Sequence, residues 1–247
     1  MKKLFTVLSL FILVSSNSFA QKIEKDLEPF NKILIGPGVN LELIRSDHEK
    51  IHIVSESELV HDLTIAVDRG ELKVYFDYKN FDFTDDNNFA NGKYTLENTP
   101  YEGIRIYAKL YFRDLEELDF RGDQKLFCKD EIRNEEFEMK IYGECEVKLS
   151  AINVINGAIK SYGENEIEVL GGNSENLKII SYGESEIKVQ GVRCEDIKLT
   201  SFGESEIEVF AENILKVKVI GEGEIRYKGD PEVKEFNLGE AHVYRID

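Results

Sequence analysis

A glycine-centred segment recurs down the second half of the chain, and this repeat constrains the fold more than any other feature. One copy reads Ile180-Ser181-Tyr182-Gly183-Glu184-Ser185-Glu186-Ile187-Lys188-Val189. The glycines in register are Gly122, Gly143, Gly163, Gly183, Gly203, Gly221 and Gly239, at separations of 21, 20, 20, 20, 18 and 18 residues. Such a period is typical of solenoid proteins, in which each copy forms one coil that stacks on the next.

Aligning the copies on their glycine separates apolar columns from charged ones. The apolar columns lie four residues before the glycine and four and six after it, as in Ile179, Ile187 and Val189. Since side chains alternate across a strand, these positions face one interior, together with the small residues two after the glycine. The β-branched content favours strands, and the leucine-rich-repeat pattern is absent. We therefore predict an all-β fold, a right-handed parallel β-solenoid or β-helix with coils of about 20 residues.

The earlier part of the chain is rich in strand patterns but less regular. Alternation predicts strands at residues 32–35, 39–44, 51–55, 63–67, 72–76, 104–110 and 115–120, with one helical turn at 56–60. Gly36-Pro37-Gly38 and Asp68-Arg69-Gly70 predict turns that each join a pair of strands. We expect a signal peptide at residues 1–20, an irregular β part at 21–118, and a repetitive solenoid part at 119–247 that continues from it.

The first twenty residues have the composition of a secretory signal. Lys2 and Lys3 precede a short apolar run, and small residues precede Gln21. This pattern predicts export to the periplasm, the cell surface or the medium, and no later run is apolar and long enough for an integral membrane segment. The chain has 48 acidic and 31 basic residues, a balance that disfavours nucleic acid as a partner.

The outward columns hold the candidate ligand-binding residues. Glutamates stand one and three residues after the glycine, and an aromatic residue stands just before it. The candidates are Tyr142, Tyr162, Tyr182, Phe202, Glu164, Glu184, Glu186 and Glu204. The aromatic column is either packing along the solenoid or a platform for sugar rings or a partner's apolar surface. The glutamates form either a solvated charged face or a site that recruits divalent cations.

Two further columns bring charges of both signs. Five residues after the glycine the signs alternate, which predicts ion pairs between neighbouring coils: Lys148, Glu168, Lys188, Glu208 and Arg226. Five residues before it stand Lys178, Lys198, Lys216 and Lys234, which add positive charge near the glutamates.

No constellation of catalytic residues stands out. The four histidines are dispersed, and no hydrolase, zinc or phosphate-binding motif is present. Cys128, Cys145 and Cys194 are expected to be packing or turn residues. Arg121-Gly122-Asp123 spells an adhesion tripeptide, but its glycine is in register with the repeats, which explains it structurally. The only candidate cofactor is a divalent cation, and Asp82, Asp85, Asp86, Asn87 and Asn88 could also chelate calcium.

The repeats carry a family resemblance. The runs Gly203-Glu204-Ser205-Glu206-Ile207-Glu208-Val209 and Tyr227-Lys228-Gly229-Asp230-Pro231 resemble the GIN domain family, the head of auto-transporter adhesins in exported proteins of Bacteroidota. The resemblance covers nearly all of the chain after residue 20 and implies a β-solenoid without known catalytic residues. Here Glu replaces both the family's small residue after each glycine and its Asp two positions later.

Three functions are compatible with these observations. The first is a non-enzymatic binding or adhesion-type module for a glycan or a surface protein. The second is a calcium-assisted, polysaccharide lyase-like enzyme, and the third is a purely structural envelope protein. The absence of a catalytic constellation favours the first, while the oligomeric state and the ligand are open.

Overall fold

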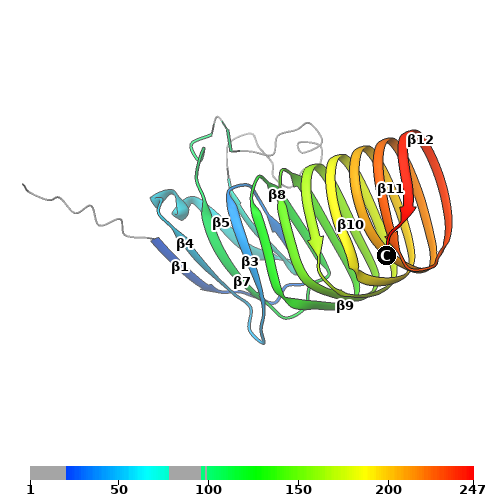
Figure 1. Cartoon of the computed structure of the whole chain (residues 1–247). Helices are drawn as coiled ribbons and strands as arrows, with labels where there is room; N and C mark the ends of the chain where they lie inside the picture. Colours follow the sequence, from blue (N-terminus) through cyan, green and yellow to red (C-terminus); the bar gives the residue numbers. More distant parts are fainter. Residues whose placement is uncertain (1–20, 78–95, 98) are drawn as a thin grey trace, which may run out of the picture.

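The protein is a β-solenoid, as the repeat predicts (Figure 1). The computed structural model describes residues 21–77, 96–97 and 99–247. Its strands form one 12-stranded sheet. They are β1 (Gln21–Asp26), β2 (Lys32–Ile35), β3 (Val39–Arg45), β4 (Lys50–Ser55), β5 (Leu63–Asp68), β6 (Glu71–Phe76), β7 (Ile106–Phe112), β8 (Glu117–Gly122), β9 (Lys125–Gly143), β10 (Glu146–Val169), β11 (Gly172–Lys228) and β12 (Glu232–Arg245), and the single-turn 3-10 helix η1 covers Glu58–Asp62.

The regular coils stack in parallel and in register. Gly163 lies opposite Gly183, and Tyr162 lies opposite Tyr182. The inward positions of one coil are 177, 179 and 181, then 185, 187 and 189, then 192 and 194, before 197 starts the next. The alternation breaks between these groups, so each coil bends there. We call the side formed by residues 177–182 and their equivalents the pre-glycine face, and the side formed by 184–189 and their equivalents the post-glycine face.

The repeated glycine forms the bend between these two faces. Gly183 has a φ of 108°, in the region that only glycine adopts at little cost. A Cβ atom on Gly183 would lie 2.7 Å from the carbonyl oxygen of Gly163 in the coil before. Both the bend and the close stacking of coils therefore require glycine at this column.

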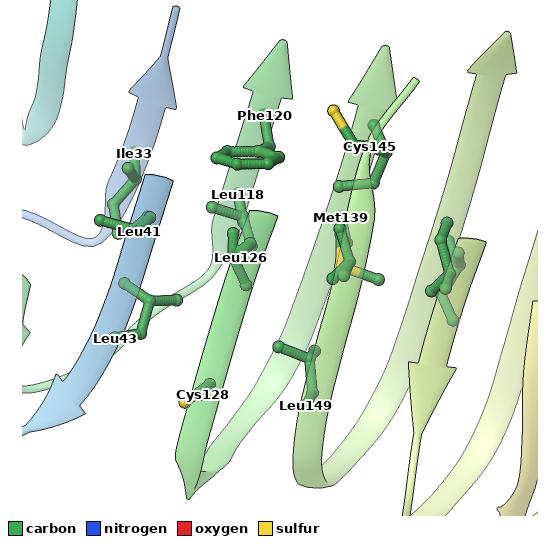
Figure 2. Packing of buried hydrophobic residues seen from close by; sticks show 14 of the residues in the cluster. Ile33, Leu41, Leu43, Leu118, Phe120, Leu126, Cys128, Met139, Cys145 and Leu149 are labelled. Atoms are coloured by element: carbon green, nitrogen blue, oxygen red, sulfur yellow. The ribbon is translucent and has the colours of Figure 1, made fainter. Parts of the chain in front are cut away.

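The predicted apolar columns line the interior. On the pre-glycine face one buried column runs across successive strands through Ile33, Leu118, Met139, Ile159 and Ile179. On the post-glycine face Leu43, Cys128 and Leu149 lie in register, and Figure 2 shows these side chains pointing into the space between the faces. The buried residues form one core cluster from Phe30 to Ile225.

Small polar residues fill the inside of the glycine bend. Asn165 and Ser185 are buried, as the sequence predicts for the column two after the glycine. The Asn165 amide donates to Ser161 Oγ at 3.0 Å, and Ser161 Oγ lies 2.9 Å from Ser185 Oγ. The bend thus satisfies these polar groups where large apolar side chains do not fit, although Ser181 Oγ, the equivalent of Ser161 Oγ in the next coil, is buried without a hydrogen-bond partner among the described residues.

The N-terminal strands extend both faces, but not in sequence order. β7 lies between β3 and β4, parallel to β3 and antiparallel to β4. β5 and β6 form an antiparallel hairpin, so the turn predicted at Asp68-Arg69-Gly70 is confirmed. The division expected at residue 118 falls within β8, which pairs with β2 on one side and β9 on the other.

The other predicted turn is also present, at Gly36-Pro37-Gly38 between β2 and β3. Gly36-Pro37-Gly38 does not join a hairpin, because β2 pairs with β6 and β8 whereas β3 pairs with β7 and β9. The segment takes the place that the repeated glycine has in later coils and bends the chain from the pre-glycine face to the post-glycine face. Residues 32–45 are therefore the first coil that follows the solenoid geometry.

Candidate functional site

The aromatic column forms a continuous stack along the pre-glycine face. Ring centroids are 4.7 Å apart for Tyr142 and Tyr162, 5.4 Å for Tyr162 and Tyr182, and 4.7 Å for Tyr182 and Phe202. The planes of the rings differ by 8° or less. The predicted stacking is therefore confirmed, and it follows from the in-register pairing of the coils.

Both ends of the stack are covered by cations. The Arg121 guanidinium lies 4.9 Å from the centroid of the Tyr142 ring, and Lys218 Nζ lies 5.7 Å from that of Phe202. Tyr142 is consequently buried, which corrects the expectation that the whole column faces outward, whereas Tyr182 is 43% exposed. Since the ring faces are occupied within the stack, the aromatic residues turn their edges to solvent.

The glutamates lie across the bend from the rings, at the start of the post-glycine face. Glu164, Glu184 and Glu204 are exposed, and in the part of the chain that the structure describes none of them forms an ion pair. With the glutamates two residues further on they border an open hollow of about 380 Å³. The floor of the hollow is formed by Asn165, Ser185 and Ser205. The hollow is strongly acidic.

The column with alternating signs forms ion pairs, but not at every coil. Lys148 pairs with Glu168 at 2.5 Å, and Arg226 pairs with Glu208 at 2.8 Å. Lys188 pairs instead with Glu186 on its own strand, so the prediction of a pair with a neighbouring coil is wrong there. The reason is that the acids above and below Lys188 are already engaged by Lys148 and Arg226.

The lysines five residues before the glycine do not neutralise the glutamates. Lys178, Lys198 and Lys216 are exposed on the pre-glycine face, on the far side of the ring column from the glycine bend. Sequence reasoning grouped them with the acidic columns because a linear repeat does not show where the coil bends. They line a separate hollow of about 430 Å³.

The other candidates from the sequence have varied outcomes. Arg121 is 2% exposed, so the Arg-Gly-Asp tripeptide is not presented as an adhesion loop. Within residues 21–77, 96–97 and 99–247, no group of three or more His, Cys, Asp and Glu side chains could hold a metal ion. The acidic segment with Asp82 to Asn88 and the predicted signal peptide lie outside the described residues.

The thiols are buried and have no disulfide partner. Burial raises the pKa of Cys128, Cys145 and Cys194 to about 12 in each case. A thiol reacts as the thiolate, so these side chains are poor nucleophiles at neutral pH. Their place in the core agrees with the prediction that they are packing residues.

Among the described residues, no helix has the length and apolar character that crossing a membrane requires.

Solved structures share this fold at low sequence identity. One, described as a "putative adhesin" from Bacteroides fragilis, is 18% identical with a TM-score of 0.78, over 92% of this chain and 97% of that one. A "putative adhesin" from Parabacteroides merdae is 18% identical with a TM-score of 0.66, over 94% and 98% of the chains. A "putative lipid binding protein" from Parabacteroides distasonis is 21% identical with a TM-score of 0.65, over 94% and 98%. These likenesses establish the fold alone.

The comparison with curated proteins finds no significant match. The comparison with family models matches residues 29–231, which begin just before the first coil and end between the bends at Gly221 and Gly239. The match therefore spans the N-terminal strands as well as the regular coils that the sequence resemblance rested on. The chain belongs to the family described as "Putative auto-transporter adhesin, head GIN domain".

Proposed function

We propose that this protein is an exported, non-enzymatic adhesion-type module that binds a basic surface protein. The contact surface is the strip formed by the carboxylates of Glu164, Glu184, Glu186 and Glu204 and the outward ring edges of Tyr162, Tyr182 and Phe202. Tyr142 anchors the stack from within and does not contact the partner. The signal peptide that the sequence predicts at residues 1–20 supports a location in the periplasm or at the cell surface.

The observation that carries the proposal is the column of glutamates without ion pairs among the described residues. Strands in adjacent coils lie about 4.8 Å apart. Two unit charges at that distance repel by about 1 kcal/mol in water. The repeat keeps Glu164, Glu184 and Glu204 in this arrangement, although it places lysines and an arginine against other acids. Lysine or arginine side chains of a partner would relieve the repulsion on binding.

The ring geometry favours a protein partner over a glycan on this strip. A sugar stacks on the face of an aromatic ring, and here the faces are taken by neighbouring rings, Arg121 and Lys218. Ring edges carry partial positive charge and suit apolar or carboxylate groups. A lipid ligand has no support at this site either, because the acidic hollow is open and polar.

The enzyme alternative has less support. A calcium-assisted lyase needs a base beside an acid cluster in a cleft, and no histidine lines the acidic hollow. The purely structural alternative makes a different prediction, namely that neutralising the glutamates changes stability without changing any binding.

The test compares two charge-matched variants of the purified protein against a deca-lysine peptide. The triple variant E164Q/E184Q/E204Q removes the glutamate column, and E28Q/E175Q/E195Q removes three exposed acids elsewhere. We expect the first variant to bind at least about tenfold more weakly, about 1.4 kcal/mol, and the second to bind as the parent does. If both variants bind deca-lysine equally more weakly than the parent, the loss of affinity is due to net charge alone and the proposal is refuted. The proposal is also refuted if the parent protein does not bind deca-lysine.

A further inference from the structure

A second charged column lies on the pre-glycine face and carries the opposite sign. Lys178, Lys198 and Lys216 occupy equivalent positions in three successive coils, and all are exposed. Across the described ranges no acid lies within ion-pair distance of any of them, whereas the next lysine, Lys234, pairs with Glu232 at 2.9 Å. Three unneutralised lysines in register are unusual in a chain with a formal charge of −17.

The N-terminal part of the same face shows how the protein neutralises lysines elsewhere. Lys140 contacts Glu117 at 2.6 Å and Glu138 at 3.1 Å, and Lys160 contacts Glu138 at 2.6 Å. Glu138 lies in register with Ala158, and Ala158 with Lys178. Along this column the residue is thus an acid at Glu138, a small residue at Ala158, and a lysine in each of the next three coils.

The lysine column borders the open hollow of about 430 Å³. Ala158 leaves space in it, because its side chain is small where the neighbouring coils carry Glu138 and Lys178. Along one side runs an amide ladder, in which Asn176 donates to Asn156 at 2.9 Å and Asn156 donates to Glu136 at 2.6 Å. In the next coil Asp196 continues this ladder, and its Oδ1 is buried without a hydrogen-bond partner among the described residues. Glu116, Glu136 and Glu138 line the other end of the hollow, where Lys140 and Lys160 contact Glu138 and Asn156 binds Glu136. The end at the lysine column therefore combines positive charge with hydroxyl-binding groups.

The spacing of these groups fits a linear polymer that runs along the solenoid axis. Each coil advances by about 4.8 Å, which is close to the length of one sugar residue in an extended polysaccharide. We propose that this hollow binds an acidic polysaccharide of uronate type, with one carboxylate against each lysine and sugar hydroxyls on the amide ladder. The site is independent of the glutamate strip, which lies on the other side of the ring column.

A nucleic acid fits this hollow less well, and a second hollow fits the acidic polysaccharide less well. A nucleic acid is repelled by the overall negative charge, and Phe137, the aromatic residue among those that line this hollow, is buried and does not offer its ring for base stacking. A second lysine-bearing hollow, of about 700 Å³, lies over β1, β4, β7, β3 and β9. Three of its lysines are engaged, since Lys109 and Lys129 contact Glu42 at 3.0 and 3.8 Å and Lys125 pairs with Glu146.

This second hollow supplies the matched control. Binding of hexagalacturonate to the purified protein is measured by calorimetry, with the neutral oligosaccharide cellohexaose and the oligonucleotide dT12 as competing probes. The variant K178Q/K198Q/K216Q removes the column, and K109Q/K125Q/K129Q removes the same charge from the second hollow. We expect hexagalacturonate to bind, to be released by added salt, and to bind at least about tenfold more weakly to the column variant alone.

Several results would overturn the proposal. These are no binding of hexagalacturonate, equal binding of cellohexaose, tighter binding of dT12, or equal losses in the two lysine variants. Circular dichroism of each variant verifies that the fold is kept. The glutamate variant E164Q/E184Q/E204Q should keep its affinity for hexagalacturonate, so a failure of this inference is distinct from a failure of the proposed function.

Discussion

The buried guanidinium of Arg121 pairs with the carboxylate of Asp119 two residues earlier on β8 and covers the ring of Tyr142 on β9. Arg121 Nη2 donates to Asp119 Oδ2 at 2.5 Å, and both residues are buried. The same side chain thus neutralises a buried acid and closes one end of the aromatic stack. It links the irregular N-terminal strands to the first regular coil.

Replacing Arg121 with Met should destabilise the protein by about 3–5 kcal/mol, because the change takes the guanidinium away from a buried carboxylate. The free energy of unfolding in urea measures this loss. The double variant D119L/R121M should recover much of it, since both charges are then removed. A cost below about 1 kcal/mol for R121M would show that the pair contributes little.

Replacing Gly183 with Ala should cost at least about 1–3 kcal/mol, because alanine is strained at a φ of 108° and its Cβ would meet the carbonyl oxygen of Gly163. Gly171 provides the control, since a Cβ there meets nothing closer than 3.7 Å. Urea unfolding of G171A should match that of the parent. Similar stabilities for G183A and the parent would mean that the bend relaxes without glycine.

Replacing Lys140 with Met should cost about 1–2 kcal/mol at neutral pH, a value reduced for partial exposure. The exposed lysine without an ion pair on the same face, Lys178, gives the control, and K178M should be neutral. Burial raises the pKa of Glu117, but hydrogen bonds from Lys140 and Lys32 outweigh it and leave this pKa below its ordinary value of 4.5. The pKa of Glu138 is likewise lowered, because bonds from Lys160 and Lys140 outweigh burial.

The sign of the pH effect follows from these lowered pKa values. The two carboxylates stabilise the folded state above about pH 4.5, and this contribution is lost as the pH falls through their lower folded-state values. Unfolding free energies measured from pH 7 to pH 3 should therefore fall less steeply for K140M than for the parent. Parallel curves would contradict the role assigned to Lys140.

The three cysteines should resist alkylation in the folded protein, because burial raises each pKa to about 12. Mass spectrometry after iodoacetamide treatment at pH 8 should find no labelled thiol in buffer and three in urea. A single thiol that reacts as fast in buffer as in urea would place that cysteine outside the core.

The regular coils could be predicted from the sequence because each column repeats the same physical requirement. Ile187 and Val189 face inward, Gly183 bends the chain, and Tyr182 stacks, as expected. The N-terminal topology could not be predicted, because β7 inserts between β3 and β4 and no local pattern records such pairing. Gly36-Pro37-Gly38 was correctly predicted to turn the chain between two strands, but the local sequence could not show that these strands pair with other strands instead of with each other.

The sequence predicted which residues of the candidate site face outward, but not how these residues are divided between the two faces. The alternation of side chains identified the outward residues, yet only the position of the bend separates Glu184 from Lys178 on different faces. Tyr142 is covered by Arg121, which takes the place of the aromatic ring in the coil before, and the repeat pattern does not show that this exchange buries the ring. Choices among ion-pair partners, such as Glu186 for Lys188, depend on which acids other coils have already engaged.

The in-register stacking of coils has a consequence for how such a protein changes over time. The coils around Gly143, Gly163, Gly183 and Gly203 each contribute one glutamate directly after the glycine, one aromatic ring directly before it and one outward position five residues before it. Duplicating a coil would lengthen every one of these columns by one unit and leave the contacts within each coil intact. The length of the binding surface and the number of binding groups on it therefore increase together when a coil is duplicated. A substitution at one position of one coil, as at Ala158, can end one column of side chains without disturbing the neighbouring columns.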